Sequence, residues 1–149
     1  SDFQLTDIHQ GIESTLTLVH HLYKNRIEVI KSFGNIPKIK CYPNELNQVF
    51  MNLFVNAAHA IADKGEVRIC TESDDKNVYI EMKDTGKGIK AENLEKIFDP
   101  GFTTKGQGVG TGLGLSISYR IIQNHKGHIN VESEINKGTK FNITLPIEG

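Results

Sequence analysis

Three polar residues lie in line within the segment 44–62, whose apolar residues recur with the period of a helix. Asn52, Asn56 and His59 are spaced four and three residues apart, so a helix projects them from one side. Asparagine is unfavourable in an exposed helix interior, where Lys, Glu or Ala is preferred. An amide oxygen can fill one octahedral position on Mg²⁺ while phosphate oxygens fill others. The pattern indicates a polar wall that faces a ligand, with an ordinary solvated face as the alternative.

One predicted strand ends in an aspartate that has the same parity as the inward-facing residues of that strand. In the segment 77–84, Ile80 and Met82 belong to the inward set, and Asp84 follows in the same phase. A carboxylate on the core face costs free energy unless it accepts a hydrogen bond. Thr139 has inward parity in the last predicted strand, so both groups could meet one planar ligand whose exocyclic amine donates to Asp84. An aspartate that caps a turn is the alternative.

Glycines concentrate in one part of the chain: eight of the 14 lie between residues 86 and 114. Glycine is entropically costly to order, so such a cluster indicates a close backbone approach or mobility. The run 106–115 leads into an apolar helical pattern, and a helix N-terminus with accessible amides suits an anion. Gln107 and Gly108 replace the Lys and Ser/Thr of a Walker loop, and no G-x-G-x-x-G fits. A P-loop and a Rossmann fingerprint are therefore excluded.

Helical and strand patterns that position these residues mix without regular alternation. This order favours an α+β sandwich, with helices on one face of a mixed or antiparallel sheet. The first few residues are expected to be irregular. The predicted elements are helices at 7–24, 44–62, 91–97 and 112–125, and strands at 26–31 and 36–41 around a Gly34-Asn35 turn, then at 66–72, 77–84, 128–134 and 139–146.

Length, charge and composition limit the number of domains, the kinds of partner and the location that can be expected. The 149 residues suit one domain, and 17 Lys and Arg balance 18 Asp and Glu. A near-neutral charge gives no reason to expect nucleic-acid binding or direct membrane contact. No apolar run approaches the roughly 20 residues of a membrane span, so a cytoplasmic location is expected. Cys41 and Cys70 are expected to be buried thiols, although a disulfide is possible in principle.

Four blocks carry a family resemblance: 52–57 (NLFVNA), 84–89 (DTGKGI), 98–105 (FDPGFTTK) and 110–115 (GTGLGL). In this order they resemble the N, G1, F and G2 boxes of the GHKL ATPase superfamily, in the version of bacterial sensor histidine kinases, similar to the nitrogen-regulation type. The segment 138–141 resembles the last, weaker glycine motif of the same family.

The resemblance implies a Bergerat ATP-binding fold of class α+β, a two-layer α/β sandwich with about three main helices on one face of a mixed, mostly antiparallel sheet. It also implies that residues 1–149 are a single catalytic and ATP-binding domain, with a flexible ATP lid at about 90–111. It implies ATP and Mg²⁺ as ligands, with Asn56 on the metal and Asp84 accepting from the adenine amine. The complete set of implied cofactor-binding residues is Asn52, Asn56, His59, Asp84, Gly86, Gly88, Ile89, Phe98, Thr104, Lys105, Gly110, Thr111, Gly112, Leu113, Gly114 and Thr139. Within it, Asn52, His59 and the 110–114 run would lie at the phosphates, Gly86 and Gly88 would admit the base, and Thr139 would assist Asp84 through a water.

The chain departs from the family pattern in two ways. Gly101 stands where relatives usually carry an aromatic or bulky residue, and none of the six histidines is followed by Asp or Glu, as a phosphoacceptor would be. The expected nucleophile is therefore a histidine on a separate dimerisation and phosphoacceptor domain, with no catalytic residue in this chain. A response-regulator receiver domain is the further expected partner. The isolated domain is expected to be a monomer and the full kinase a homodimer.

The expected reaction is in-line transfer of the ATP γ-phosphoryl group to that histidine. One alternative is an ATP hydrolase of the gyrase or MutL kind, but those enzymes place a water-activating glutamate where this chain has Asn52. Others are a nucleotide-sensing module without phosphotransfer and a serine kinase acting on an anti-sigma partner.

Overall fold

A five-stranded sheet forms the centre of the structure, a computed structural model that describes residues 2–102 and 114–149. Its strand order is β2–β4–β5–β7–β6. The first pair is parallel and the other three are antiparallel, so the predicted mixed, mostly antiparallel sheet is confirmed. The strands are β2 (Ile27–Phe33), β4 (Gly65–Ser73), β5 (Asn77–Asp84), β6 (His128–Glu134) and β7 (Gly138–Pro146).

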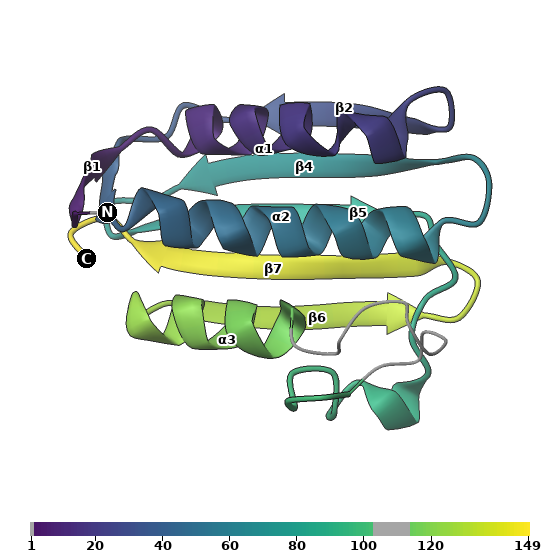
Figure 1. Cartoon of the computed structure of the whole chain (residues 1–149). Helices are drawn as coiled ribbons and strands as arrows, with labels where there is room; N and C mark the ends of the chain where they lie inside the picture. Colours follow the sequence, from purple (N-terminus) through teal and green to yellow (C-terminus); the bar gives the residue numbers. More distant parts are fainter. Residues whose placement is uncertain (1, 103–113) are drawn as a thin grey trace.

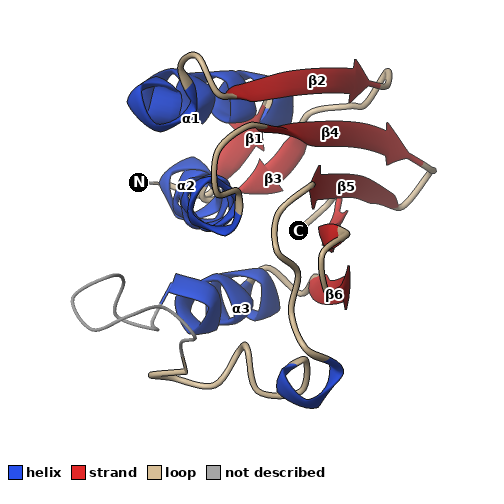
Figure 2. Ribbon diagram, turned by 90° about the vertical axis from the view of Figure 1, so that its right-hand side faces the viewer, coloured by secondary structure: helices blue, strands red, loops and turns tan. Residues whose placement is uncertain are grey.

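Three α-helices cover one face of this sheet: α1 (Ile8–Tyr23), α2 (Pro43–Ala60) and α3 (Gly114–Asn124). Figures 1 and 2 show the helices in one layer and the strands in the other. The central helix, α2, packs against both α1 and α3. The predicted two-layer α+β sandwich is therefore confirmed.

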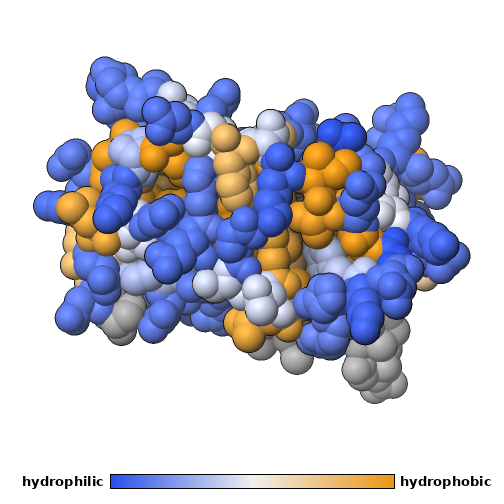
Figure 3. Space-filling model, turned by 90° about the horizontal axis from the view of Figure 1, so that it is seen from above, coloured by the Kyte–Doolittle hydropathy of each residue, from blue (hydrophilic) through white to orange (hydrophobic). Residues whose placement is uncertain are grey.

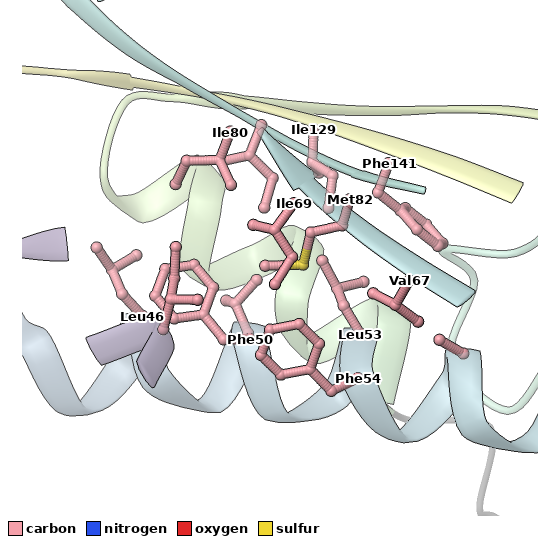
Figure 4. Close-up of a cluster of buried hydrophobic side chains, with 14 of the residues drawn as sticks. Leu46, Phe50, Leu53, Phe54, Val67, Ile69, Ile80, Met82, Ile129 and Phe141 are labelled. Carbon is pink, nitrogen blue, oxygen red and sulfur yellow. The ribbon is translucent and has the colours of Figure 1, made fainter. Parts of the chain in front are cut away.

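The core lies between α2 and the strands (Figure 4). The core forms there because the helical period gives α2 one apolar stripe that faces the sheet, and the strand period turns every second residue of each strand toward α2. The buried residues that meet there are Leu46, Phe50, Leu53 and Phe54 from α2, and Val67, Ile69, Ile80, Met82, Ile129 and Phe141 from the sheet. The opposite side of α2 is thereby left for polar residues.

Residues 2 and 3 have no regular secondary structure, as expected for the first few residues, but a strand follows at once. Residues Gln4–Thr6 form β1, which pairs antiparallel with β3 (Ile39–Cys41) in a separate two-stranded sheet. The strands predicted at 26–31 and 36–41 are observed at 27–33 and 39–41, but they do not pair with each other. Gly34 instead donates its backbone amide to the Thr71 carbonyl of β4, at 2.9 Å. The turn signal at 34–35 is local and contains no information about the strand partners on either side.

The helix predicted at 91–97 is shorter than expected. Only the 3-10 helix η1 (Ala91–Asn93) forms, and hydrogen bonds three residues apart continue as turns, such as Lys96 to Asn93 at 2.8 Å. The helix predicted at 112–125 is observed as α3 from residue 114, and residues 112 and 113 lie outside the described part. Cys41 and Cys70 are free thiols; Cys41 is buried as expected, whereas Cys70 is only partly buried.

The surface seen from the β2 edge is mainly hydrophilic, with separate apolar patches (Figure 3). Leu18 of α1 is among the exposed apolar residues, and single exposed residues of this kind are usual in folded domains. Within residues 2–102 and 114–149, none of the helices has both the length and the apolar character that crossing a membrane requires.

Candidate functional site

A cavity of about 570 Å³ opens beside the polar side of α2. Its wall combines α2, the end of β5, the loop that follows β5, the start of α3 and the turn between β6 and β7. Eight residues of the predicted site line it: Asn52, Asn56, His59, Asp84, Gly88, Ile89, Gly114 and Thr139. Phe102 of the block 98–105 lines the cavity as well, so the tertiary structure brings together residues from all four sequence blocks and from the weaker motif near 138.

The in-line residues of α2 form one wall of this cavity. Asn52, Asn56 and His59 all line it, because the opposite stripe of α2 is committed to the core. Asn52 also reaches the next helix: its Nδ2 donates to the Gly114 carbonyl at 2.9 Å and to the Ser118 Oγ at 3.1 Å. This wall offers amide and imidazole groups without a carboxylate.

Asp84 lies in the cavity wall and is only 6% exposed. Its Oδ1 accepts from the Gly86 backbone amide at 2.8 Å. Burial raises the pKa of Asp84 above that of an ordinary aspartate, while hydrogen bonds from the backbone amides of Gly86 and Thr139 act to lower it. The site thus holds a carboxylate in an environment where an additional donor from a ligand would be favourable.

A hydroxyl on β6 connects the residues around Asp84, and sequence reasoning missed it. Ser133 Oγ accepts from the Ile89 backbone amide at 2.8 Å, donates to the Gly138 carbonyl at 2.9 Å and lies 2.8 Å from the Thr139 Oγ1. Asp84 and Thr139 are themselves paired across β5 and β7. Only strand pairing reveals this role, because Ser133 is an ordinary alternating residue in the sequence.

The two glycines of the loop after β5 have different surroundings. Gly88 has a φ of +77° and lines the cavity, and a Cβ there would collide with the Glu134 carbonyl. Gly86 is not among the cavity-lining residues. A Cβ on Gly86 would lie 2.6 Å from the Ala60 Cβ, so the loop needs glycine there to pack against the end of α2. The adjacent Lys87 amide donates to the Ala60 carbonyl at 2.9 Å.

Phe98 is also outside the cavity lining, and its ring packs 5.3 Å from that of Tyr119 on α3. Phe102, the second phenylalanine of the block 98–105, does line the cavity. The remaining predicted site residues lie outside the described part of the chain, as does the lid beyond Phe102: Thr104, Lys105, Gly110, Thr111, Gly112 and Leu113.

Several cavity residues were not predicted. Lys87, Lys90 and Asn93 line it from the region after β5, and Ile135 and Asn136 line it from the β6–β7 turn. The Asn136 amide donates to the Lys87 carbonyl at 2.8 Å, which holds the turn against the loop. Lys87 lies within the glycine-containing block 84–89, and Lys90 and Asn93 follow that block closely, a proximity that could have drawn attention to them. The turn residues had no such signal.

The cavity has chemically distinct parts. Ile89, Ile97 and Phe141 supply apolar surface in a lining that also contains the buried carboxylate. Apolar surface beside one acceptor suits a flat heteroaromatic ring that carries an amine. The amides and imidazole of α2 and the N-terminal residue of α3 suit an anionic group. One ligand with an aromatic amine and a phosphate chain fits both parts.

The chain is similar to a known family and to named relatives. Residues 41–149 match the model of the family described as histidine kinase-, DNA gyrase B-, and HSP90-like ATPase. Sporulation kinase E of Bacillus subtilis (strain 168) is 46% identical over 114 residues, 76% of this chain and 15% of the relative. Sensor histidine kinase ZraS of Escherichia coli (strain K12) is 37% identical over 146 residues, 97% of this chain and 31% of the relative. The chain thus spans less than a third of either relative.

Solved structures show the same fold. The nucleotide-free catalytic domain of histidine kinase ThkA is 30% identical, with a TM-score of 0.89 and complete coverage of both chains. A structure of ThkA in complex with the response regulator protein TrrA is 28% identical, with a TM-score of 0.83, and the match covers 97% of this chain and 42% of that one.

Proposed function

The chain belongs to the histidine kinase-, DNA gyrase B-, and HSP90-like ATPase family, and we propose that it binds ATP with Mg²⁺ and delivers the γ-phosphoryl group to a histidine on a separate domain. One observation carries this proposal. A buried carboxylate, Asp84, shares a cavity of about 570 Å³ with an in-line wall of Asn52, Asn56 and His59. Each relative named above is a kinase, which supports phosphotransfer over other uses of ATP.

The adenine would bind at the Asp84 end. Its exocyclic amine would donate to the Asp84 carboxylate, and Thr139 would assist through a water. Gly88 and Ile89 border the same space. The hydrogen bonds from the Ile89 and Gly86 amides to Ser133 and Asp84 hold this end in one conformation before any ligand arrives.

The triphosphate would extend toward α2 and the start of α3. The Asn56 amide oxygen would be a protein ligand to Mg²⁺, whose preferred ligands are hard oxygens, with phosphate and water oxygens filling the other positions. The bound metal would neutralise charge on the phosphates. His59 and Asn52 would lie beside them, and the residues outside the described part, Thr104, Lys105 and 110–113, are proposed as further phosphate contacts.

The reaction is an in-line displacement at the γ-phosphorus. A histidine nitrogen of the acceptor domain forms the new P–N bond as the bond to the β–γ bridging oxygen breaks, and ADP leaves with that electron pair. Such transfer depends on positioning and charge neutralisation. This chain would supply both, and the acceptor domain would supply the nucleophile.

The geometry of Asn52 argues against hydrolysis as the main reaction. A hydrolase needs a base that takes a proton from water. Asn52 occupies the position of that base in the hydrolases of this superfamily, yet it has an amide and donates to Gly114 and Ser118. An amide cannot accept the proton.

The proposed macromolecular partners are a dimerisation and phosphoacceptor domain and a receiver domain. The ThkA complex with a response regulator supports the second, because the match to that structure covers 97% of this chain. We further propose that the isolated domain is a monomer, that the full kinase is a homodimer, and that phosphotransfer takes place in the cytoplasm.

Isothermal calorimetry tests the proposal directly. ATP with Mg²⁺ injected into the protein should give saturable binding heat without sustained heat of turnover. Asp84→Asn should weaken binding about tenfold or more, because a hydrogen bond to a charged acceptor contributes about 1.5–3 kcal/mol. Sustained turnover heat that Asp84→Asn abolishes would favour the hydrolase. No heat at two temperatures would contradict nucleotide binding altogether.

A further inference from the structure

The side chain of Asn52 on α2 donates two hydrogen bonds to the neighbouring helix α3. The single nitrogen of its carboxamide donates at 2.9 Å to the carbonyl of Gly114, the first residue of α3, and at 3.1 Å to the hydroxyl of Ser118 one turn later. An amide nitrogen has two hydrogens, so these two bonds use its full donor capacity. Its remaining polar atom is the carbonyl oxygen, an acceptor that would repel a phosphate oxygen.

Ser118 is fully buried, with 0% of its surface exposed, and it is not among the residues that line the cavity. A buried hydroxyl costs free energy unless it is hydrogen-bonded. The bond from Asn52 satisfies the Ser118 oxygen in the contact between α2 and α3. Ser118 therefore has a partner on the cavity wall without any access to a ligand in the cavity.

Gly114 connects this contact to the cavity, because it is both an Asn52 partner and a cavity-lining residue. The first amides of a helix lack partners within the helix and carry the positive end of its dipole. The position of the first turn of α3 therefore decides where these amides point relative to a bound anion.

We propose that Asn52 is a positioning residue, which holds the first turn of α3 against α2 through Gly114 and Ser118 so that the helix N-terminus faces the triphosphate. This inference rests on the proposed ATP-binding function. It gives a reason for asparagine at this position: a glutamate could not donate to the Gly114 carbonyl, whereas asparagine can.

Ser118→Ala separates this role from direct contact between Asn52 and phosphate. The variant removes one partner of Asn52 at a position that no ligand reaches. Calorimetry with Mg-ATP and with adenosine provides the readout, since adenosine lacks the phosphates. We expect about fivefold weaker ATP binding in Ser118→Ala, the loss of one ordinary hydrogen bond, with adenosine binding unchanged.

Double-variant analysis adds a second criterion. Asn52→Ala should weaken ATP binding at least as much, and adding Ser118→Ala to it should cause little further loss, because both changes break the same link. Thr15→Val is the matched control. Thr15 is also a buried helical hydroxyl, bonded to the Gly11 carbonyl at 2.8 Å in α1, and does not line the cavity. It should change neither affinity.

Other outcomes overturn the inference. Unchanged ATP affinity in Ser118→Ala with a loss in Asn52→Ala would mean that Asn52 acts on the ligand directly. An equal loss of ATP and adenosine binding would mean a general structural effect. Should Ser118→Ala fail to fold, Ser118→Cys offers a similar volume with a much weaker acceptor. Wild-type protein that binds neither ligand would instead contradict the proposed function itself.

Discussion

At the scale of single residues, Asp84 combines a cost in stability with its proposed role in binding. Its carboxylate is 6% exposed, and burial raises its pKa despite the amide donors of Gly86 and Thr139. A raised pKa means that the folded state binds the proton more tightly than the unfolded state does. The contribution of Asp84 to stability is therefore complete at acid pH and falls as pH rises through its folded-state pKa.

Asp84→Asn should therefore stabilise the ligand-free domain at pH 7. Asparagine has similar volume, keeps an oxygen for the Gly86 amide and has no charge to desolvate. The gain in melting temperature over wild type should shrink as pH falls below the usual pKa of an aspartate, where Asp84 is protonated in both states. Thermal melts from pH 3 to 8 measure this difference.

Asp74→Asn is the control variant, for which we expect the opposite change in stability. Hydrogen bonds from the Tyr79 hydroxyl and from the Asn77 and Lys76 amides lower the pKa of Asp74. This variant should lose stability at neutral pH, and the loss should disappear at acid pH. A melting temperature of Asp84→Asn below wild type at pH 7 would contradict the account of Asp84.

At the scale of elements, Arg26 joins the C-terminal ends of two helices. Its Nε donates to the Leu22 carbonyl of α1 at 2.9 Å, and its Nη2 donates to the Ala58 carbonyl of α2 at 2.7 Å. Its Nη1 donates to the Ile61 carbonyl at 2.9 Å, just beyond α2. The last carbonyls of a helix lack helical partners and carry partial negative charge, so a forked cation stabilises both ends.

Arg26→Ala should lower the free energy of unfolding by about 2 kcal/mol, since hydrogen bonds to a charged group are lost at both helix ends. Arg26→Lys should recover less than half, because a compact ammonium cannot span carbonyls on both helices as the planar fork does. Urea unfolding of the three proteins tests this. Equal stability of Arg26→Lys and wild type would show that charge alone is sufficient.

At the scale of the whole molecule, the helical layer positions the cavity and the other sheet face remains polar. On that face Lys140 lies 3.7 Å from Glu81 and 3.4 Å from Glu132, partly exposed pairs that contribute little to stability. The cavity is lined jointly by α2, α3, the sheet and the β6–β7 turn, so it exists only when all of them are folded together. Unfolding therefore removes the whole site, and any ligand that binds it stabilises the domain.

Mg-ATP at a hundred times its Kd should stabilise the fold by about 2.7 kcal/mol, which raises the melting temperature of a domain of this size by about 5–10 °C. Mg-GTP should give less than half of that shift, because guanine presents a carbonyl oxygen where adenine presents the amine that Asp84 would accept from. Differential scanning fluorimetry measures both. Equal shifts would show that Asp84 does not select the base.

Local sequence patterns were sufficient to identify the chemical groups of the site and the faces of the elements that bear them. The helical period of 44–62 and the strand alternation ending at Asp84 assigned Asn52, Asn56, His59 and Asp84 to one side of their elements, and all four line the cavity. The same patterns predicted the two-layer sandwich. These features depend on the backbone periods of helix and strand, which can be read within a few neighbouring residues.

The strand partners and hydrogen-bond partners, in contrast, are known only from the folded structure. The pairing of β2 with β4, the pairing of β1 with β3, the Ser133 hydroxyl beneath Ile89 and the Asn52 bonds to α3 all join distant parts of the chain. Gly86 likewise serves the contact with Ala60, which the glycine pattern alone could not distinguish from a ligand contact. A hydrogen-bond donor or a missing Cβ is visible in the sequence, but the atom that it meets is set by long-range packing, which no local period encodes.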